Sequence, residues 1–369
     1  MSDAALLDSL PGPQTPLSEL LVRIAEVPAP TFAEAARGEL IAALWRAAGL
    51  EPLIDERGNV VAELPGGSGP LVLIAAHLDS VFGPEVDVSV ARAPERYSGP
   101  GVGDNAANLA VLTRLVQTPD IARRRPRLLL AATVGEEGTG DLRGARGIVE
   151  DHGSRLQHFV ALDGHLGVVT DRAVGSVRYR VEMLAPGGHA WGDYPNPSAV
   201  HATGDAVARL ARLSIPRQPR SSLNVGQLWG GTSINTIAET AGFNLDLRSI
   251  SPETLTLLEE AALGEIERAA DESDCRSQLE LLGRRPAAES DNSALLNAAR
   301  SALSAAELEM TMAAGSTDAN VAMAAGISAV AFGAYLGGGA HRLDEWVDPR
   351  SLEVGLGVLA SFLAELADA

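Results

Sequence analysis

Histidine and acidic residues gather in five short clusters along this 369-residue chain. Imidazole nitrogens and carboxylate oxygens are the ligands with which proteins bind zinc and pairs of divalent cations. Taken alone, each cluster has a simpler interpretation, such as a hydrogen-bonded loop pair, a helix N-cap or a solvated pair of surface acids. The clusters are His77-Leu78-Asp79, Gly103-Asp104-Asn105, Glu136-Glu137, Asp163-Gly164-His165 and Gly339-Ala340-His341.

The positions of these clusters favour the metal-binding interpretation. Four of them follow apolar runs that predict buried strands, and ligands bind at the carboxyl ends of strands in an open α/β sheet. We therefore expect His77, Glu137, Asp163 and His341 to share one edge of a sheet. Two histidines and three carboxylates suit a pair of zinc ions, with one carboxylate between them. The predicted strands are Leu71–Ala76, Leu128–Val134, Phe159–Leu162 and Ala329–Phe332.

The elements around these strands predict an α/β fold with a mixed, mostly parallel sheet between layers of helices. Helical periodicity from Thr15 to Gly49 predicts two opening helices. Thr31 and Glu34 stand in the register of a capping box for the second of them. A hairpin that turns at Arg57-Gly58 is expected to follow.

The pattern changes in the middle of the chain. Val177–Met183 alternates apolar and polar residues, which predicts an antiparallel sheet with one covered face. Asn196-Pro197 and Ser251-Pro252 predict helices with proline at the first helical position. We expect an inserted α+β domain at residues 176–285, between the two parts of the α/β domain at residues 1–175 and 286–369.

Composition excludes several classes of function. The formal net charge of −19 disfavours binding to nucleic acid or to anionic membranes, because either would require a basic face. Cys275 is the single cysteine, so an internal disulfide is impossible and a cytoplasmic location is expected. Acidic residues near Met1, together with the absence of a long apolar run, predict neither a secretory signal nor a membrane span.

The order and spacing of the motifs resemble the dinuclear zinc aminoacylase and exopeptidase family, which includes carboxypeptidase G, peptidase T, succinyl-diaminopimelate desuccinylase and acetylornithine deacetylase. The likeness covers nearly the whole chain and looks closest to the peptidase T-like branch. One departure is Asp104-Asn105-Ala106-Ala107-Asn108, where the family often has Asp-x-Lys-Gly. Besides the five clusters, the matching motifs are Gly187-Gly188-His189, Gly231-Thr232-Ser233-Ile234-Asn235, Asp246-Leu247-Arg248 and Gly315-Ser316-Thr317-Asp318.

The resemblance implies a role for each ligand. Asp104 would bridge two zinc ions, for which cobalt or manganese could substitute. One metal site would be completed by His77 and Asp163, and the other by Glu137 and His341. The resemblance also implies a cis peptide bond after Asp104.

The resemblance further implies that Glu136 is the general base for a water molecule between the metals. Asp79 would orient the ring of His77 through its second nitrogen. His189 of the inserted domain would stabilise the oxyanion in the partner's site of a homodimer. Asn235 and Arg248 would bind a substrate carboxylate, although Arg248 could equally be a cross-strand partner of an acid.

The expected activity is hydrolysis of an amide bond in short peptides by an exopeptidase, either an aminopeptidase or a carboxypeptidase. The alternative is an N-acyl amino acid deacylase of the acetylornithine deacetylase or desuccinylase type, since it would use the same metals and base. A catalytically inactive binding protein of this fold is a third alternative. It is disfavoured because the ligands, Glu136 and Asp79 are all present.

Overall fold

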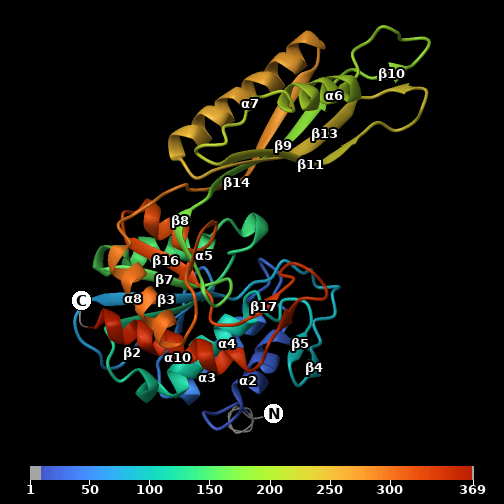
Figure 1. The fold of residues 1–369 in the computed structure, drawn as a ribbon. Helices are drawn as coiled ribbons and strands as arrows, with labels where there is room; N and C mark the ends of the chain where they lie inside the picture. The colour runs from blue at the N-terminus through green and yellow to red at the C-terminus, as the bar shows by residue number, and fades with distance from the viewer. Residues whose placement is uncertain (1–9, 368–369) are drawn as a thin grey trace. The chain divides into compact units, whose positions relative to one another are not determined.

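The computed structural model describes residues 10–367 (Figure 1). The chain forms two compact units, and the second interrupts the first. The first unit runs up to Ala173 and resumes at Glu289, and the second is Val174–Ala288. Within the described part of the chain, no helix is both long and apolar enough to cross a membrane.

The first unit is built on an eight-stranded mixed sheet in the order β1-β2-β6-β3-β7-β16-β8-β15. The neighbours β6, β3, β7 and β16 run parallel, and the predicted hairpin pairs β1 with β2. The strands are β1 (Leu53–Ile54), β2 (Val60–Leu64), β3 (Leu71–His77), β6 (Arg127–Thr133), β7 (His158–Leu162), β8 (Val168–Ala173), β15 (Thr311–Gly315) and β16 (Ser328–Phe332).

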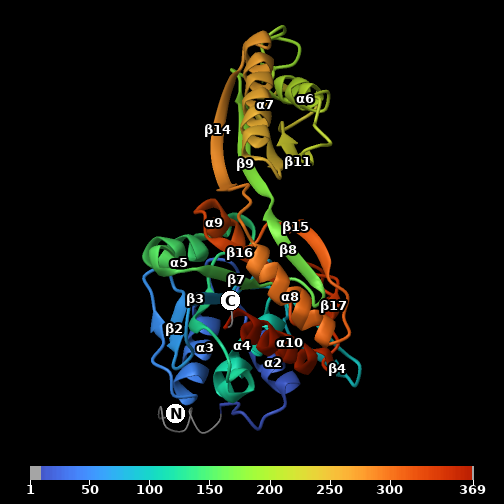
Figure 2. The ribbon, with the colours of Figure 1, turned by 60° about the vertical axis from the view of Figure 1, so that its left-hand side comes forward.

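Apolar side chains on both faces of the central strands explain why helices cover the sheet on both sides. Every residue of β3 is buried, as a strand between two helical layers requires. One group of helices is linked by successive contacts and contains α2 (Leu17–Ala25), α3 (Ala35–Ala47), α4 (Ala106–Gln117), α8 (Ser293–Ala305) and α10 (Ser351–Leu366). A second group contains α5 (Arg143–His152) and α9 (Ala319–Ala324), visible beside β7 and β16 in Figure 2.

Short elements complete the first unit. A four-stranded sheet in the order β17-β18-β5-β4 brings the segment after β16 beside the segment before α4. Its strands are β4 (Ala91–Ala93), β5 (Arg96–Ser98), β17 (Gly337–Gly338) and β18 (Trp346–Val347). Single 3-10 turns are η1 (Pro119–Ala122), η2 (Gly138–Gly140) and η3 (Gly153–Arg155).

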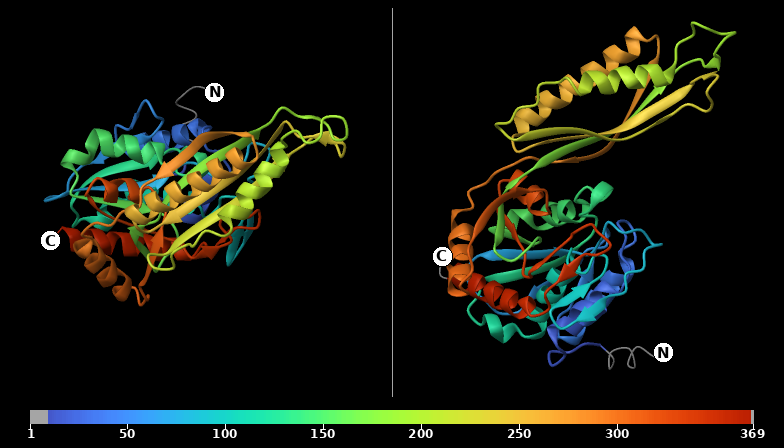
Figure 3. Two further views of the ribbon diagram at one scale, coloured as in Figure 1. Left: turned by 90° about the horizontal axis from the view of Figure 1, so that it is seen from above. Right: turned by 45° about the vertical axis from the view of Figure 1, so that its right-hand side comes forward.

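The second unit is a four-stranded antiparallel sheet, β11-β13-β9-β14, with α6 and α7 on one face (Figure 3). Alternate residues of its strands, including Val177, Val181 and Phe243, are buried beneath the helices. Its elements are β9 (Gly175–Leu184), β10 (Gly188–His189), α6 (Ala199–Leu210), β11 (Ser221–Gly230), β12 (Thr236–Ile237), β13 (Thr240–Ser249), α7 (Pro252–Glu272) and β14 (Arg276–Arg285).

Two local predictions of helix starts are wrong, and one is confirmed. Ser251 caps α7 with Pro252 at its first position. By contrast, α6 begins two residues after Pro197, with Ser198 as its N-cap. At α3 the capping box does not form. The hydroxyl of Thr31 donates a hydrogen bond to Asp79 instead, and the carboxylate of Glu34 accepts one from the N–H of Gly135 in the loop after β6. Tertiary partners outcompete the local cap at that site.

Candidate metal centre

His77 is the last residue of the central strand β3, and its ring is almost fully buried. Nδ1 lies 3.1 Å from the backbone carbonyl oxygen of Asp79. A carbonyl can only accept, so Nδ1 donates the hydrogen bond there and Nε2 is the ring nitrogen that points toward the other acidic residues. Nε2 lies 3.0 Å from Oδ1 of Asp104. The ring is therefore oriented as a ligand, but chiefly by the carbonyl of Asp79, whose carboxylate is 3.6 Å from Nδ1.

The carboxylate of Asp79 instead fixes the neighbouring loop. Oδ1 accepts a hydrogen bond from the backbone N–H of Glu136, and Oδ2 accepts one from that of Glu137, both at 2.9 Å. Burial opposes its ionisation, but the nearby His77 ring and the hydrogen bonds from these amides lower the pKa of Asp79. Asp79 consequently links the end of β3 to the loop after β6.

Asp104 lies between two imidazole rings at the start of α4. Its Oδ1 faces Nε2 of His77, and its Oδ2 lies 3.3 Å from Nε2 of His341. Burial acts against ionisation, yet the bonds to His341 and His77 hold the pKa of Asp104 well below its usual range. The Asp104-Asn105 peptide bond is cis, as the resemblance implies. One oxygen toward each histidine is the arrangement that a bridging carboxylate requires.

His341 approaches the same carboxylates from the segment after β17. Its Nε2 lies 3.0 Å from Oε1 of Glu137. Hydrogen bonds to Asp104 and Glu137 raise the pKa of His341 to about 10. Two carboxylates around one imidazole nitrogen favour a positive charge at that point.

Asp163 follows β7 directly, and its backbone N–H donates to the carbonyl of Phe332 at the end of the parallel neighbour β16. Burial, followed by the charge of Asp104, raises the pKa of Asp163 to about 7. The charges of Glu137 and Asp318 raise this pKa further, whereas the charge of His77 lowers it. The centre thus holds more acidic groups than its histidines can neutralise, which is the electrostatic signature of a cation site.

The ligand atoms fall into overlapping groups that fit two divalent ions. Potential ligand atoms of His77, Asp104 and Asp163 lie within 4.8 Å of one another, as do those of Asp104, Glu137 and His341. The two groups share Asp104, and paired metals in hydrolases lie about 3.5–4 Å apart. A third group joins Glu136 to His77 and Glu137. The structure therefore brings together all six side chains that the sequence singled out at this edge.

Sequence reasoning missed Glu345, a buried acid four residues after His341. Its oxygens accept hydrogen bonds from the backbone N–H groups of Gly101 and Asp104, each at 2.8 Å. Burial is the main reason that the pKa of Glu345 rises to about 8. Its position close after a candidate ligand was the available signal, but which amides it binds depends on the tertiary fold.

Two asparagines occupy the stretch where this chain departs from the family pattern. Asn105 donates to the carbonyl of Leu162 at 2.9 Å, next to Asp163. Asn108 donates to Asn105 Oδ1 at 2.6 Å and accepts from the N–H of Ala334 at 2.8 Å. Both side chains are fully buried. They tie the Asp104 loop to the ends of β7 and β16.

The remaining predicted residues lie in the second unit. His189 is exposed on β10, and its Nδ1 accepts hydrogen bonds from the N–H groups of Trp191 and Gly192. The ring proton is then on Nε2, so the ring can donate outward. Asn235 is exposed on the adjoining loop, where its backbone carbonyl accepts a hydrogen bond from the N–H of Ala190 at 2.9 Å.

Arg248 is half-exposed on β13 and donates from Nε to Oδ2 of Asp246 at 2.7 Å, on the same strand. The cross-strand partner of Asp246 is Arg178, whose Nε lies 3.0 Å from Oδ1. Arg248 therefore shares its acid with a second arginine, and part of its guanidinium surface stays open to solvent.

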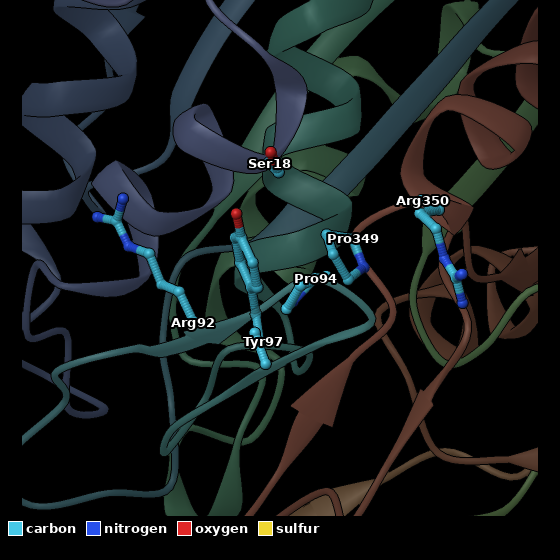
Figure 4. A pocket seen from close by; sticks show the side chains of 7 residues that line it. Ser18, Arg92, Pro94, Tyr97, Pro349 and Arg350 are labelled. Atoms are coloured by element: carbon cyan, nitrogen blue, oxygen red, sulfur yellow. The ribbon is translucent and has the colours of Figure 1, made fainter.

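A separate surface pocket of about 410 Å³ in the first unit contains none of the predicted site residues (Figure 4). Its two arginines already bind acids: Arg92 lies 2.8 Å from Glu19, and Arg350 lies 2.9 Å from Asp348. The side chains labelled in the figure are Ser18, Arg92, Pro94, Tyr97, Pro349 and Arg350.

Comparison with curated proteins finds partial matches. A probable carboxypeptidase of Aspergillus terreus is 29% identical over 215 residues, which cover 53% of this chain and 48% of that protein. An acetylornithine deacetylase of Vibrio cholerae is 23% identical over 240 residues, 59% of this chain and 62% of that protein. The matches thus span about half to three fifths of these relatives' length.

Solved structures match over almost the full chain. An aminopeptidase PepT of Bacillus cereus has a TM-score of 0.78 at 20% identity, with 95% of this chain and 98% of that chain covered. A tripeptidase of Staphylococcus aureus has a TM-score of 0.82 at 19% identity, with 96% and 98% covered. A dinuclear metal binding peptidase of Bacillus subtilis has a TM-score of 0.68 at 16% identity, with 99% of both chains covered.

At these identities the structural matches establish the fold, which is the mixed sheet between helices with a separate antiparallel sheet. The family assignment comes from the sequence itself. The pattern of peptidase family M20/M25/M40 matches residues 73–365, which include every cluster of the metal centre. The protein therefore belongs to peptidase family M20/M25/M40.

Proposed function

We propose that the protein is an exopeptidase that hydrolyses an amide bond in short peptides with the help of two zinc ions. The observation that carries this proposal is the pair of overlapping ligand groups that share Asp104. His77 and Asp163 would complete one site, and Glu137 and His341 the other. Two bound zinc ions would polarise the scissile carbonyl and increase the acidity of a water molecule.

Glu136 is the proposed general base. Its ligand atoms lie within 4.8 Å of those of His77 and Glu137, while its backbone is held by Asp79. A carboxylate beside two cations stays ionised at neutral pH, so it can accept a proton from water and deliver it to the leaving amine. Glu137 lies 3.0 Å from Nε2 of His341, so we assign Glu137 as a metal ligand and Glu136 as the base.

The second unit is proposed to contribute to substrate binding. His189 can donate from Nε2 to a developing oxyanion, and Asn235 and Arg248 would bind a substrate carboxylate. We further propose a homodimer through this unit, in which His189 serves the partner's site. Exposed apolar side chains near His189 support an interface, namely Trp191 at 90%, Tyr194 at 79% and Ile234 at 104% of full exposure.

A second candidate is an N-acyl amino acid deacylase. The Vibrio cholerae relative is named an acetylornithine deacetylase, and such a reaction would use the same ligands and base. The tripeptidase of Staphylococcus aureus, which matches over nearly its whole length, favours the peptide reaction instead.

The test is a screen of dipeptides, tripeptides and N-acetyl and N-succinyl amino acids with zinc-loaded protein, and with a Glu136→Gln variant as the blank. Peptides with a free amino terminus are expected to be cleaved, whereas the acylated compounds are spared. Cleavage of the acylated compounds alone would select the deacylase. If no compound is hydrolysed faster than in the blank, the proposed function is wrong.

A further inference from the structure

The loop that carries the proposed general base is held by acidic side chains at three successive positions. The N–H of Gly135 donates to Oε1 of Glu34 at 3.0 Å. The next two amides, of Glu136 and Glu137, donate to the two oxygens of Asp79. Glu34 and Asp79 are both buried, and hydrogen bonds to ionised acceptors are roughly twice as strong as neutral ones.

One short stretch at the start of α3 organises this arrangement. Glu34 is the N-cap of α3, and Thr31 precedes it by three residues. The hydroxyl of Thr31 donates to Oδ2 of Asp79 at 2.9 Å, the same oxygen that receives the N–H of Glu137. Thr31 and Glu34 therefore act on the same loop, Thr31 through Asp79 and Glu34 directly.

The next turn of the same helix holds the other ligand loop. Arg37 is 1% exposed, and its Nη1 donates to the carbonyl of Leu78 at 2.8 Å, between His77 and Asp79. Its remaining donors bind the carbonyls of Ala25, at the end of α2, and of Val27, two residues later. A buried guanidinium that serves two segments is costly unless it is fully bonded, so the spacing of these segments is narrowly set.

Glu34 is itself fixed from the far side. Arg143 donates from Nη2 to both of its oxygens, at 2.9 and 2.8 Å, and from Nη1 to the carbonyl of Arg57 at 2.7 Å. Gly135 has φ of +64°, and a side chain added there would meet Arg143 at 2.6 Å. The loop, Glu34 and Arg143 thus fit together in a single arrangement.

We propose that Thr31 and Glu34 are positioning residues for the hydrolytic site, because they lock the backbone of residues 135–137 before any metal or substrate is bound. Neither side chain is among the potential metal ligands of the described residues. Their effect on turnover depends on the proposed function, whereas their hold on the backbone does not. The two parts can therefore be tested separately.

The backbone test uses hydrogen–deuterium exchange of the metal-free, full-length protein. Thr31→Val and Glu34→Ala remove the two contacts. Thr31→Ser keeps the hydroxyl donor and Glu34→Gln keeps an acceptor for Gly135. Glu39→Ala is the matched control at an exposed position of the same helix. We expect faster exchange in a peptide covering residues 133–138 for the first pair. Exchange at the wild-type rate is expected for the control and for Thr31→Ser.

The kinetic test uses the same variants with a cleaved substrate. Loss of a partner that orients a ligand lowers activity or metal affinity by about 10- to 100-fold. We expect this fall in kcat, with KM near wild type, for Thr31→Val and Glu34→Ala, and recovery in Thr31→Ser. Recovery in Glu34→Gln should be partial, because its amide keeps only one of the two acceptor oxygens that Arg143 contacts. If Glu34→Ala does not fold, Thr31→Val and Thr31→Ser still decide the question.

Two results would overturn the proposal: wild-type exchange of residues 133–138 in Thr31→Val, or equal loss of kcat in Thr31→Ser and Thr31→Val. Failure of the proposed function gives a different pattern. In that case no substrate is hydrolysed by the wild type, and the exchange difference between Thr31→Val and Thr31→Ser remains.

Discussion

The two units hold their predicted functional side chains in opposite ways. At the edge of the eight-stranded sheet, His77, Asp79 and Glu136 are buried, and the cluster is bonded to loops from distant parts of the chain. In the second unit, the side chains of His189 on β10 and of Asn235 on the adjoining loop are exposed and bond to groups close to them in sequence.

This contrast follows from the cost of burying polar groups. A buried carboxylate or imidazole must have its hydrogen bonds satisfied, so a buried site is fixed before its ligands arrive. An exposed side chain can satisfy its polar atoms with water. Its position is then set by what it meets when substrate or a partner binds. The comparison predicts that the first unit carries the chemistry and that the second adjusts its rate.

Removing divalent cations from the first unit should have the largest effect on the rate of hydrolysis. Chelation is expected to abolish hydrolysis, because it would remove the cations that activate water and balance the charge of the acidic groups. Adding zinc, cobalt or manganese should restore hydrolysis. Added zinc should also raise the thermal midpoint of the apo-protein, since a ligand that binds only the folded state stabilises it. Full activity of a protein shown by elemental analysis to be metal-free would contradict the two-metal proposal.

Glu136→Gln should come next in magnitude. General acid–base catalysis contributes about 10²- to 10⁴-fold, and the substitution removes the proton acceptor while keeping the shape of the side chain. We expect kcat to fall by that range while bound zinc, measured by elemental analysis, stays near wild type. Asp120→Asn, at an exposed acid in η1, is the matched control. Retained turnover in Glu136→Gln would mean that another group is the base.

His189→Ala tests the second unit. Loss of one oxyanion donor costs about 10²- to 10³-fold in kcat. The fall should be in kcat, because the donor acts on charge that develops during the reaction. His201→Ala, at an exposed histidine of α6, serves as the control. If the dimer proposal holds, mixing His189→Ala with Glu136→Gln should regain part of the activity, whereas a fully active monomer in sedimentation would exclude action in the partner's site.

The smallest effect, on the stability of the second unit, is expected from removing an ion pair. Arg284 donates to both oxygens of Glu259, at 2.8 and 2.5 Å, and Tyr179 donates to the same carboxylate. The bond to Arg284 is the main reason that the pKa of Glu259 is lowered, against the effect of burial. A pair of this kind contributes about 0.2–1 kcal/mol.

Because the folded-state pKa of Glu259 is depressed, its contribution is complete above the unfolded pKa of about 4.3 and disappears as the pH falls through the folded value. Glu259→Gln should therefore lower the free energy of unfolding at pH 7, and by progressively less as the pH falls below about 4.3. Thermal unfolding across this range measures the difference. A constant difference at all pH values would show that the charge is not involved.

Several features of the fold and site followed from sequence alone. The apolar runs at β3, β6, β7 and β16 predicted parallel strands, and polar residues after such strands meet at one edge. That rule predicts that His77 and Asp163 lie close together, and the structure confirms it. Ser251-Pro252 likewise determined the start of α7, because the cap and the proline act within one turn.

Only the tertiary structure decided which side chains hold the loops in place. Thr31 and Glu34 have the local pattern of a capping box, yet both bind loops that lie far away in sequence. Glu345 and Asn108 bind backbone amides near Asp104 and β16, and no spacing rule specifies such partners. Periodicity fixes where strands and helices run, but a hydrogen bond between distant segments depends on how those elements pack against one another.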